Sequence, residues 1–337
     1  MLKIGKGKLD GLKKLSNQNG VIGALAIDQR GSIEKMISKA KGEAAKIEEI
    51  EEFKEAVSKE LTPYVSAILL DLEYGKPAMK AKNPEAGLLL AYEKTGYDAS
   101  TPGRLPDLLD DLSALRIKAY GADAVKLLVY YDPDEPAEIN DIKHAFIERI
   151  GAECKTVDIP FFLEPVTYDS KIEDAKSLQY AKVKPDKVKK TIAELSKPQY
   201  LIDVLKLEVP INLHFTAGYT DGETAYTKEE AINHFKEAAE LSKLPFIYLS
   251  AGVTAEQFRQ TIELATQAGT PFSGVLCGRA TWQDGIDVYG KEGLQGLTTW
   301  LRKEGKENVV ELNTLLDKGA VPWWTIYGGL DKIEVVK

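Results

Sequence analysis

Two lysines stand inside short apolar segments, where a charged side chain is unusual. Lys126 lies in Ala124–Leu128 and Lys206 lies in Asp203–Leu207. A buried lysine is costly unless it is paired or neutral, and a second ammonium nearby also disfavours the charged form. A neutral lysine amine is a nucleophile that can form a Schiff base with a carbonyl compound. For each lysine alone, a structural ion pair or an extended side chain that reaches solvent is the competing interpretation.

A glutamate stands between these two lysines in the chain. Glu164 follows the apolar segment Pro160–Leu163 and precedes Pro165. Burial raises the pKa of a carboxylic acid and nearby lysines lower it, so such a group can move protons in a reaction. Its competing role is to pair with a buried lysine. The two lysines and the glutamate together favour catalysis.

Small and polar residues end three other apolar segments. Ser250-Ala251-Gly252 and Gly278-Arg279 follow the last two segments, and Asp28-Gln29-Arg30 follows the first. Small residues let backbone N–H groups approach an anion, and an arginine adds a fork of donors. We therefore expect a phosphate site at Ser250, Gly252, Gly278 and Arg279, with Arg30 available for a second anion.

These residues all fall at the ends of apolar segments that read as buried parallel strands, because they show little polar alternation. The eight segments are Val21–Ile27, Val65–Leu70, Gly87–Tyr92, Ala124–Val129, Pro160–Leu163, Ile202–Leu207, Pro245–Leu249 and Gly274–Cys277. Between them, helices are predicted over Lys46–Leu61, Leu105–Tyr120, Ala137–Cys154, Lys184–Ser196, Thr227–Ser242 and Thr254–Ala268.

The alternation predicts one (β/α)8 TIM barrel, in which the carboxyl ends of the strands carry the chemistry. No linker divides the chain, so we expect a single domain over residues 1–337. Tyr74–Pro84 is predicted as a loop, and Trp300–Val336 as a C-terminal extension packed on the barrel.

Composition narrows the classes of function. The 44 basic and 52 acidic residues give a formal charge of −8, which argues against a general nucleic-acid-binding protein. Two cysteines and three histidines without metal-ligand spacing predict neither a disulfide framework nor a metal site. The lysine-containing start lacks an apolar signal region, and no apolar run is long enough to span a membrane. We expect a cytoplasmic protein that needs no metal or other cofactor.

Six motifs together resemble the class I tagatose-1,6-bisphosphate aldolase family. They are Ala26–Gly31, Ala91–Tyr97, Phe162–Pro165, Val204–Pro210, Leu249–Val253 and Cys277–Trp282. The resemblance covers nearly the whole chain and implies a (β/α)8 barrel that cleaves a ketose bisphosphate without a metal. The implied products are glycerone phosphate and D-glyceraldehyde 3-phosphate, and the implied pathway is lactose and galactose catabolism through tagatose 6-phosphate.

The resemblance also assigns roles to residues. It places the Schiff-base lysine at Lys206 and the acid/base glutamate at Glu164, with Lys126 and Asp28 completing the catalytic set. The expected substrate- and phosphate-binding residues are Arg30, Gln29, Ser250, Gly252, Gly278 and Arg279. We expect a small-molecule ketose bisphosphate as the substrate and a homo-oligomeric assembly, with no nucleic-acid or membrane partner.

Two alternatives stay open at this point. One is a related Schiff-base aldolase that acts on a sulfo-sugar phosphate, which would change one terminal anion of the substrate. The other is a barrel that senses a sugar phosphate through the same pocket and serves a regulatory role. The motifs do not distinguish tagatose from fructose bisphosphate, because they do not reveal the configuration selected at C4.

Overall fold

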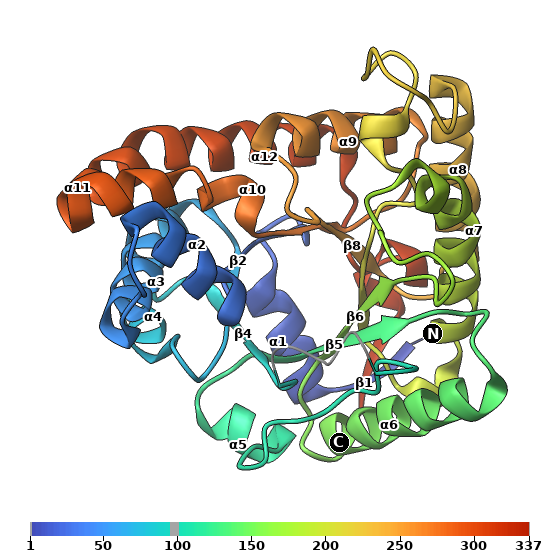
Figure 1. Ribbon diagram of the computed structural model, residues 1–337. Helices are drawn as coiled ribbons and strands as arrows, with labels where there is room; N and C mark the ends of the chain where they lie inside the picture. Colours follow the sequence, from blue (N-terminus) through green and yellow to red (C-terminus); the bar gives the residue numbers. More distant parts are fainter. Residues whose placement is uncertain (1, 95–100, 337) are drawn as a thin grey trace.

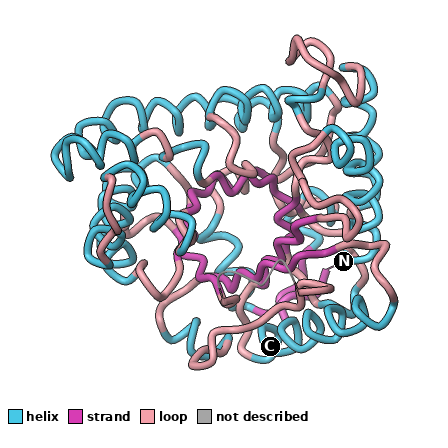
Figure 2. Tube along the Cα trace, in the orientation of Figure 1, coloured by secondary structure: helices cyan, strands magenta, loops and turns pink. Residues whose placement is uncertain are grey.

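The eight apolar segments form one closed barrel of parallel strands. In the computed structural model, which describes residues 2–94 and 101–336, the strands follow chain order around the ring and the first pairs with the last. Figure 2 shows this ring surrounded by helices. The barrel strands are β2 (Ile22–Ala26), β3 (Ala67–Leu70), β4 (Gly87–Ala91), β5 (Ala124–Tyr131), β6 (Phe161–Thr167), β7 (Val204–Leu207), β8 (Phe246–Leu249) and β9 (Gly274–Cys277). The predicted (β/α)8 barrel is confirmed, and every predicted segment overlaps a strand; β5 and β6 continue two and four residues beyond their predicted ends.

Four helices match their predicted positions to within two residues: α3 (Ile47–Leu61), α6 (Ala137–Thr156), α8 (Lys228–Leu241) and α9 (Ala255–Gln267). Capping boxes begin α8 at Thr227 and α9 at Thr254. In the first, Glu230 N–H donates to Thr227 Oγ1 at 3.1 Å, and Thr227 N–H donates to the Glu230 carboxylate at 2.8 Å. These reciprocal bonds satisfy backbone donors that a helix start leaves free.

The predicted helix over Leu105–Tyr120 is wrong for most of its length. Only α5 (Ala114–Ala119) is helical there, and it begins after Ser113, whose Oγ accepts from Arg116 N–H. The preceding residues pair instead with the chain beyond β4: Lys94 N–H donates to the Asp107 carbonyl at 2.9 Å. Because this contact uses backbone groups that a helix would need, the segment stays extended.

Three more helices differ from the sequence predictions. The predicted loop Tyr74–Pro84 contains α4 (Lys76–Ala81), whose proline lies in the first turn, where no backbone donor is needed. A second helix, α7 (Leu178–Leu195), begins six residues before the predicted start at Lys184, because Ser177 caps it. The sequence analysis did not predict α2 (Gly31–Lys41), which follows β2 after four intervening residues.

The chain beyond β9 is largely helical, whereas the sequence analysis predicted only a C-terminal extension over Trp300–Val336. It forms α10 (Arg279–Trp282), α11 (Gly285–Trp300) and α12 (Lys306–Gly319), followed by the final strand β10 (Ile333–Val336). Figure 1 shows α11 and α12 along one side of the barrel. No helix in the described ranges is long and apolar enough to cross a membrane.

The amino-terminal end of the barrel is closed by both ends of the chain. The first strand, β1 (Leu2–Gly5), pairs in parallel with β10, and α1 (Lys6–Leu15) follows it. Leu9, Leu12 and Leu15 of α1 and the fully buried Trp323 belong to the same apolar cluster as the inward-facing side chains of the strands. The carboxyl-terminal end is therefore the open end.

Strand geometry carries the ionisable residues to that open end. Successive side chains of a strand point to opposite faces, so residues two apart share a face. The inward-facing apolar residues Ala26, Ala91, Ala124, Phe162 and Val204 are each followed, two positions later, by Asp28, Glu93, Lys126, Glu164 and Lys206. The barrel thus ends in an inward-facing layer of charged groups.

Candidate active site

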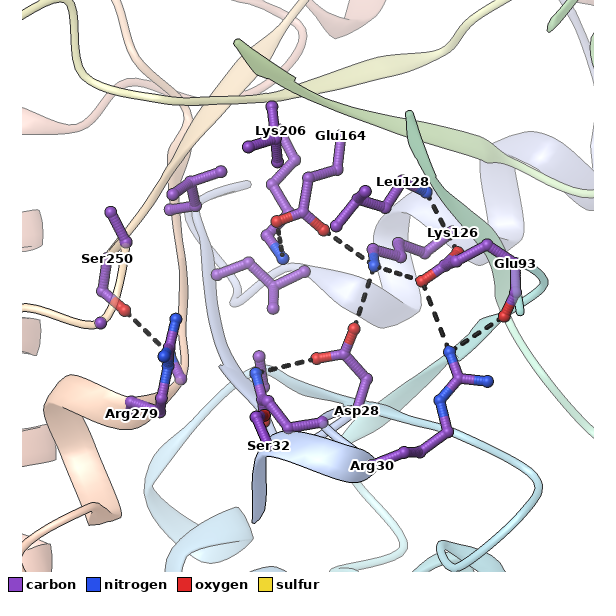
Figure 3. Close-up of a pocket in the computed structure, with 18 of the residues that line it drawn as sticks. Asp28, Arg30, Ser32, Glu93, Lys126, Leu128, Glu164, Lys206, Ser250 and Arg279 are labelled. Atoms are coloured by element: carbon purple, nitrogen blue, oxygen red, sulfur yellow. Dashed lines mark hydrogen bonds and ion pairs between the residues drawn. The ribbon is translucent and has the colours of Figure 1, made fainter. Parts of the chain in front are cut away.

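A cavity of about 610 Å³ opens at the carboxyl ends of the strands. It is lined by every residue that the sequence analysis assigned to the site: Asp28, Gln29, Arg30, Lys126, Glu164, Lys206, Ser250, Gly252, Gly278 and Arg279. Figure 3 shows most of these side chains converging on one space. Of the motif Ala91–Tyr97, Thr95, Gly96 and Tyr97 lie outside the described residues.

Lys126 is surrounded by three carboxylates. Its Nζ lies 2.7 Å from Glu93 Oε1, 2.8 Å from Glu164 Oε2 and 3.0 Å from Asp28 Oδ2, and its side chain is almost fully buried (Figure 3). Burial alone would lower the pKa of this lysine, but the three carboxylates outweigh it and raise the pKa of Lys126 well above its usual value. Lys126 is therefore a fixed cation.

The neighbouring lysines lower the pKa values of two carboxyl groups that line the cavity, Asp28 and Glu164. Burial raises the pKa of a carboxyl group, yet Lys126 and Lys206 together lower the pKa of Glu164 below its usual value. The pKa of Asp28 is also lowered by these two lysines, against the effect of burial. Both side chains are consequently held as carboxylates, which can accept protons.

Lys206 has a different environment from Lys126. Its Nζ lies 2.8 Å from Glu164 Oε1, and Glu164 is its one carboxylate ion-pair partner in the part of the chain that the structure describes. The strand register pairs Leu163 with Leu205, so the next residues, Glu164 and Lys206, lie side by side on β6 and β7. The residue is 4% exposed and lines the cavity. Glu164 thus bridges the two lysines, one through each oxygen.

Arg30 and Glu93 lie beside this network on the β2–β4 side. Arg30 Nη2 donates to the Glu93 carbonyl at 2.9 Å and lies 3.9 Å from its carboxylate. The other Glu93 oxygen accepts from Leu128 N–H at 3.0 Å. Sequence reasoning placed Glu93 at a strand end but gave it no role, because one of its partners is a backbone group without a sequence signal.

The predicted phosphate site forms where β8 and β9 end. Gly278 N–H donates to Ser250 Oγ at 3.3 Å, which ties the two strand ends together. Gly252 has a positive φ of 73°, and a Cβ at this position would lie 2.6 Å from Arg279 Cζ. Glycine therefore allows the guanidinium to lie directly against the loop backbone.

A second group of donors lies at the start of α2. Arg30 precedes this helix and is 3% exposed, and its Nε and Nη1 have no hydrogen-bond partner within residues 2–94 and 101–336. Ser32 and Lys35, in the first turns of α2, also line the cavity. Sequence reasoning missed Ser32 and Lys35, because it predicted no helix directly after the first strand.

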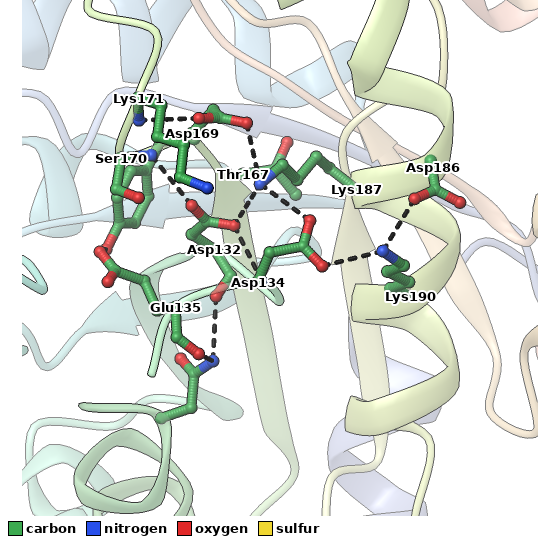
Figure 4. Close-up of polar contacts among 12 residues, drawn as sticks. Asp132, Asp134, Glu135, Thr167, Asp169, Ser170, Lys171, Asp186, Lys187 and Lys190 are labelled. Atoms are coloured by element: carbon green, nitrogen blue, oxygen red, sulfur yellow. Dashed lines mark hydrogen bonds and ion pairs between the residues drawn. The ribbon is translucent and has the colours of Figure 1, made fainter. Parts of the chain in front are cut away.

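Loops next to the cavity are fixed by a second ion cluster (Figure 4). Lys187 Nζ of α7 lies 2.5 Å from Asp132 and 3.0 Å from both Asp134 and Asp169. Asp132 also accepts from Ser170 N–H at 2.9 Å. The cluster joins the loops that follow β5 and β6 to α7.

Arg104 stacks on two tyrosines beside the cavity, Tyr130 of β5 and Tyr168 after β6. The Arg104 guanidinium lies 4.3 Å from the ring centre of Tyr168 and 5.5 Å from that of Tyr130, which lines the cavity. The Tyr168 hydroxyl donates to Glu135 at 3.0 Å and accepts from Lys143 Nζ at 3.2 Å. Tyr130 is another lining residue that the sequence analysis did not identify.

The described residues contain no group of three or more His, Cys, Asp or Glu side chains placed to hold a metal ion. Three carboxylates do converge at one point, but the ammonium of Lys126 occupies that point. The positive charge among these carboxylates is therefore supplied by the chain itself.

The fold and the cavity define a barrel enzyme whose ionisable groups meet at the carboxyl ends of the strands. The chain belongs to the DeoC/LacD family of aldolases, whose family model matches residues 22–284.

Relatives of this chain carry the name tagatose 1,6-diphosphate aldolase. The protein of that name from Listeria monocytogenes serotype 4a is 65% identical over 337 residues, which are 100% of this chain and 99% of the relative. Tagatose 1,6-diphosphate aldolase 2 of Enterococcus faecalis is 58% identical over 323 residues, 96% of this chain and 97% of the relative. The family inferred from the sequence motifs is thereby confirmed.

A solved structure supports the fold. Fructose-bisphosphate aldolase from Plasmodium falciparum superposes with a TM-score of 0.65, covering 90% of this chain and 93% of that chain. At 16% sequence identity, this likeness concerns the fold alone.

Proposed function

We propose that this protein is a Schiff-base aldolase that cleaves D-tagatose 1,6-bisphosphate into glycerone phosphate and D-glyceraldehyde 3-phosphate. The relatives with the same name over their full length support the substrate. One observation supports the chemistry above all: Lys126 contacts three carboxylates, whereas Lys206 is paired with Glu164, itself a proton acceptor. Lys206 is therefore the lysine that can give up a proton to its neighbour and attack.

In the proposed reaction, Lys206 Nζ transfers a proton to Glu164 and adds to the C2 carbonyl. The resulting carbinolamine loses its hydroxyl as water with a proton from Glu164, which leaves an iminium. Glu164 then takes the C4 hydroxyl proton, and the C3–C4 electron pair moves into the iminium to form an enamine. Glyceraldehyde 3-phosphate leaves. Protonation at C3 and addition of water at C2 release glycerone phosphate and restore Lys206.

The cavity offers donors for a substrate with two phosphates. Ser250, Gly252, Gly278 and Arg279, after β8 and β9, form one donor group, and Gln29, Arg30, Ser32 and Lys35, after β2, form the other. We assign one phosphate to each group. Anchoring both ends fixes the scissile bond beside Glu164 and Lys206, so binding is converted into orientation.

We also propose the wider setting of the enzyme. The reaction would serve lactose and galactose catabolism through tagatose 6-phosphate, in the cytoplasm, with residues 1–337 acting as one domain in a homo-oligomer. The proposal excludes nucleic acid and membranes as partners, which agrees with the net charge of −8 and the lack of long apolar segments in the sequence.

The decisive experiment is borohydride trapping with glycerone phosphate, followed by peptide mass mapping. The wild-type protein should gain one reduced adduct on Lys206. Lys206→Met should form no adduct and lose nearly all turnover, whereas Lys126→Met should still be modified at Lys206. An adduct on Lys126 in the wild-type protein would overturn the assignment of the nucleophile.

Two further assays define the substrate and the metal requirement. Cleavage of tagatose bisphosphate, fructose bisphosphate and a sulfo-sugar phosphate should be measured side by side, and preference for the last would replace the proposed substrate. Activity should survive EDTA, because the iminium accepts the electron pair that a metal would otherwise stabilise. Loss restored by Zn²⁺ would contradict the Schiff-base mechanism.

A further inference from the structure

We infer that Glu93 is a positioning residue of this active site, which acts through Lys126 to hold Asp28 and Glu164 in place. The inference rests on the proposed function, since it concerns the groups assigned to the aldol cleavage. Neither the sequence motifs nor the proposed mechanism gives Glu93 a task, yet it lines the cavity and is 4% exposed.

The ammonium group of Lys126 contacts three carboxylates, those of Asp28, Glu93 and Glu164. An ammonium group has three N–H donors. The Nζ of Lys126 donates to Glu93 Oε1 at 2.7 Å and to Asp28 Oδ2 at 3.0 Å, and it forms an ion pair with Glu164 Oε2 at 2.8 Å. Two of its three donors are thus bound to Asp28 and Glu93, and its charge also lies against Glu164. Its contribution is therefore to hold its carboxylate partners.

Lys126 links residues from opposite sides of the barrel. In a ring of eight strands running from β2 to β9, β2 and β6 lie on opposite sides. Asp28 follows β2 and Glu164 lies on β6, and both bind the same Nζ. Lys126, on β5, thus extends across the barrel and links its two sides (Figure 3).

Glu93 differs from the other two carboxylates because both of its oxygens are bound to one strand. Oε1 accepts from Lys126 and Oε2 accepts from the backbone N–H of Leu128, both on β5. Arg30 Nη2 adds a bond to the Glu93 carbonyl. Glu93 is thus fixed by the barrel backbone and fixes the ammonium in turn, which sets the positions of Asp28 and Glu164.

This arrangement predicts how substitutions at position 93 act. Glutamine has one acceptor oxygen and an NH₂ group, so in either orientation a donor faces Leu128 N–H or the Lys126 ammonium. Aspartate keeps the charge but is one methylene shorter, so it cannot reach both partners from the same backbone position. Both variants leave Lys206 and Arg279 intact, and Arg30 keeps its hydrogen bond to the backbone carbonyl of residue 93, while Lys126 loses its anchor.

The test compares Glu93→Gln and Glu93→Asp with the wild-type protein, each alone and combined with Lys126→Met. We expect Glu93→Gln to lower kcat ~10-fold or more, because misplacement by about 1 Å can cost as much as 100-fold. KM should change less than about threefold. In the Lys126→Met background, single-turnover formation of the Lys206 adduct should fall no further on adding Glu93→Gln, because both changes break the same link. Glu93→Asp should fall between wild type and Glu93→Gln.

Asp71→Asn is the matched control. Asp71 and its partner Lys54 are both fully buried, and they form an ion pair next to the same network without lining the cavity. Loss of this pair should lower the melting temperature, and any effect on the rate should multiply with that of Lys126→Met. The inference is overturned if Glu93→Gln behaves in this way, if its kcat stays within twofold of wild type, or if KM rises as much as kcat falls. A wild-type protein without aldolase activity would instead refute the proposed function.

Discussion

Two lysines of the same barrel layer have different tasks because of the carboxylates around them. Lys126 and Lys206 both stand in apolar segments, and sequence reasoning could recognise each as a candidate nucleophile. It could not separate them on physical grounds, because the distinction depends on side chains that reach across the barrel. Asp28 is nearly a hundred positions from Lys126 in the chain, yet it lies 3.0 Å away.

Glu164→Gln tests the proton-transfer role. The amide keeps the size of the side chain but cannot exchange protons, so we expect kcat to fall by ~100-fold or more. KM should change much less, because the phosphate groups anchor the substrate. The melting temperature should also fall, since both lysines lose a partner. Kinetics and thermal melts should be run together. A variant that is destabilised but keeps kcat within tenfold of wild type would leave Glu164 with a structural role only.

The lowered pKa values of Asp28 and Glu164 predict how stability depends on pH. Carboxyl groups of the unfolded chain have an ordinary pKa of about 4. Below that pH the unfolded chain binds protons that the folded protein does not, so its stability falls as the pH decreases towards the folded values. The contribution is fully present above pH ~5. Urea unfolding between pH 5 and pH 3 should show a steeper loss for wild type than for Glu164→Gln, and equal slopes would contradict the prediction.

At the scale of elements, strands were easier to predict than helices. A strand buried on both faces must be apolar along its length, so Gly87–Ala91 and Gly274–Cys277 stand out without knowledge of their neighbours. The segment 105–113 has residues that suit a helix, but its backbone groups pair with the chain beyond β4. That choice depends on tertiary contacts, and local sequence carries no signal for it.

The loop after β8 offers a test at the same scale. Gly252 and Gly269 both have left-handed backbone angles, with φ values of 73° and 67°. An alanine at Gly269 would meet nothing within 4 Å, whereas one at Gly252 would collide with Arg279. Both substitutions should cost stability by ~1–2 kcal/mol. Only Gly252→Ala should raise KM, by roughly tenfold, because it displaces a phosphate-binding guanidinium. Equal KM values for the two variants would remove Arg279 from the phosphate site.

At the scale of the whole molecule, stability and chemistry lie at opposite ends of the barrel. Trp323 is fully buried against α1 and the inward-facing side chains, far along the strands from the charged layer. Trp323→Ala should cost ~3–5 kcal/mol of unfolding free energy and leave kcat unchanged well below the melting temperature. Ile326→Ala, at a side chain that is 41% exposed, should change stability by less than about 0.5 kcal/mol. Denaturant unfolding measures both, and a large loss of kcat in Trp323→Ala would show that the two ends are linked.

Six charged groups of the active site are balanced in sign both before and after the connection from β5 to β6. Asp28, Arg30, Glu93 and Lys126 all precede β6, with two charges of each sign, and Glu164 and Lys206 follow β5 with one of each. A cut between β5 and β6 would leave the charges of these six groups balanced within each half of the barrel. The bridge from Lys126 to Glu164 would form only when the halves meet. For these six active-site groups each half is therefore neutral by itself, and association of the halves would restore the ion pair between Lys126 and Glu164.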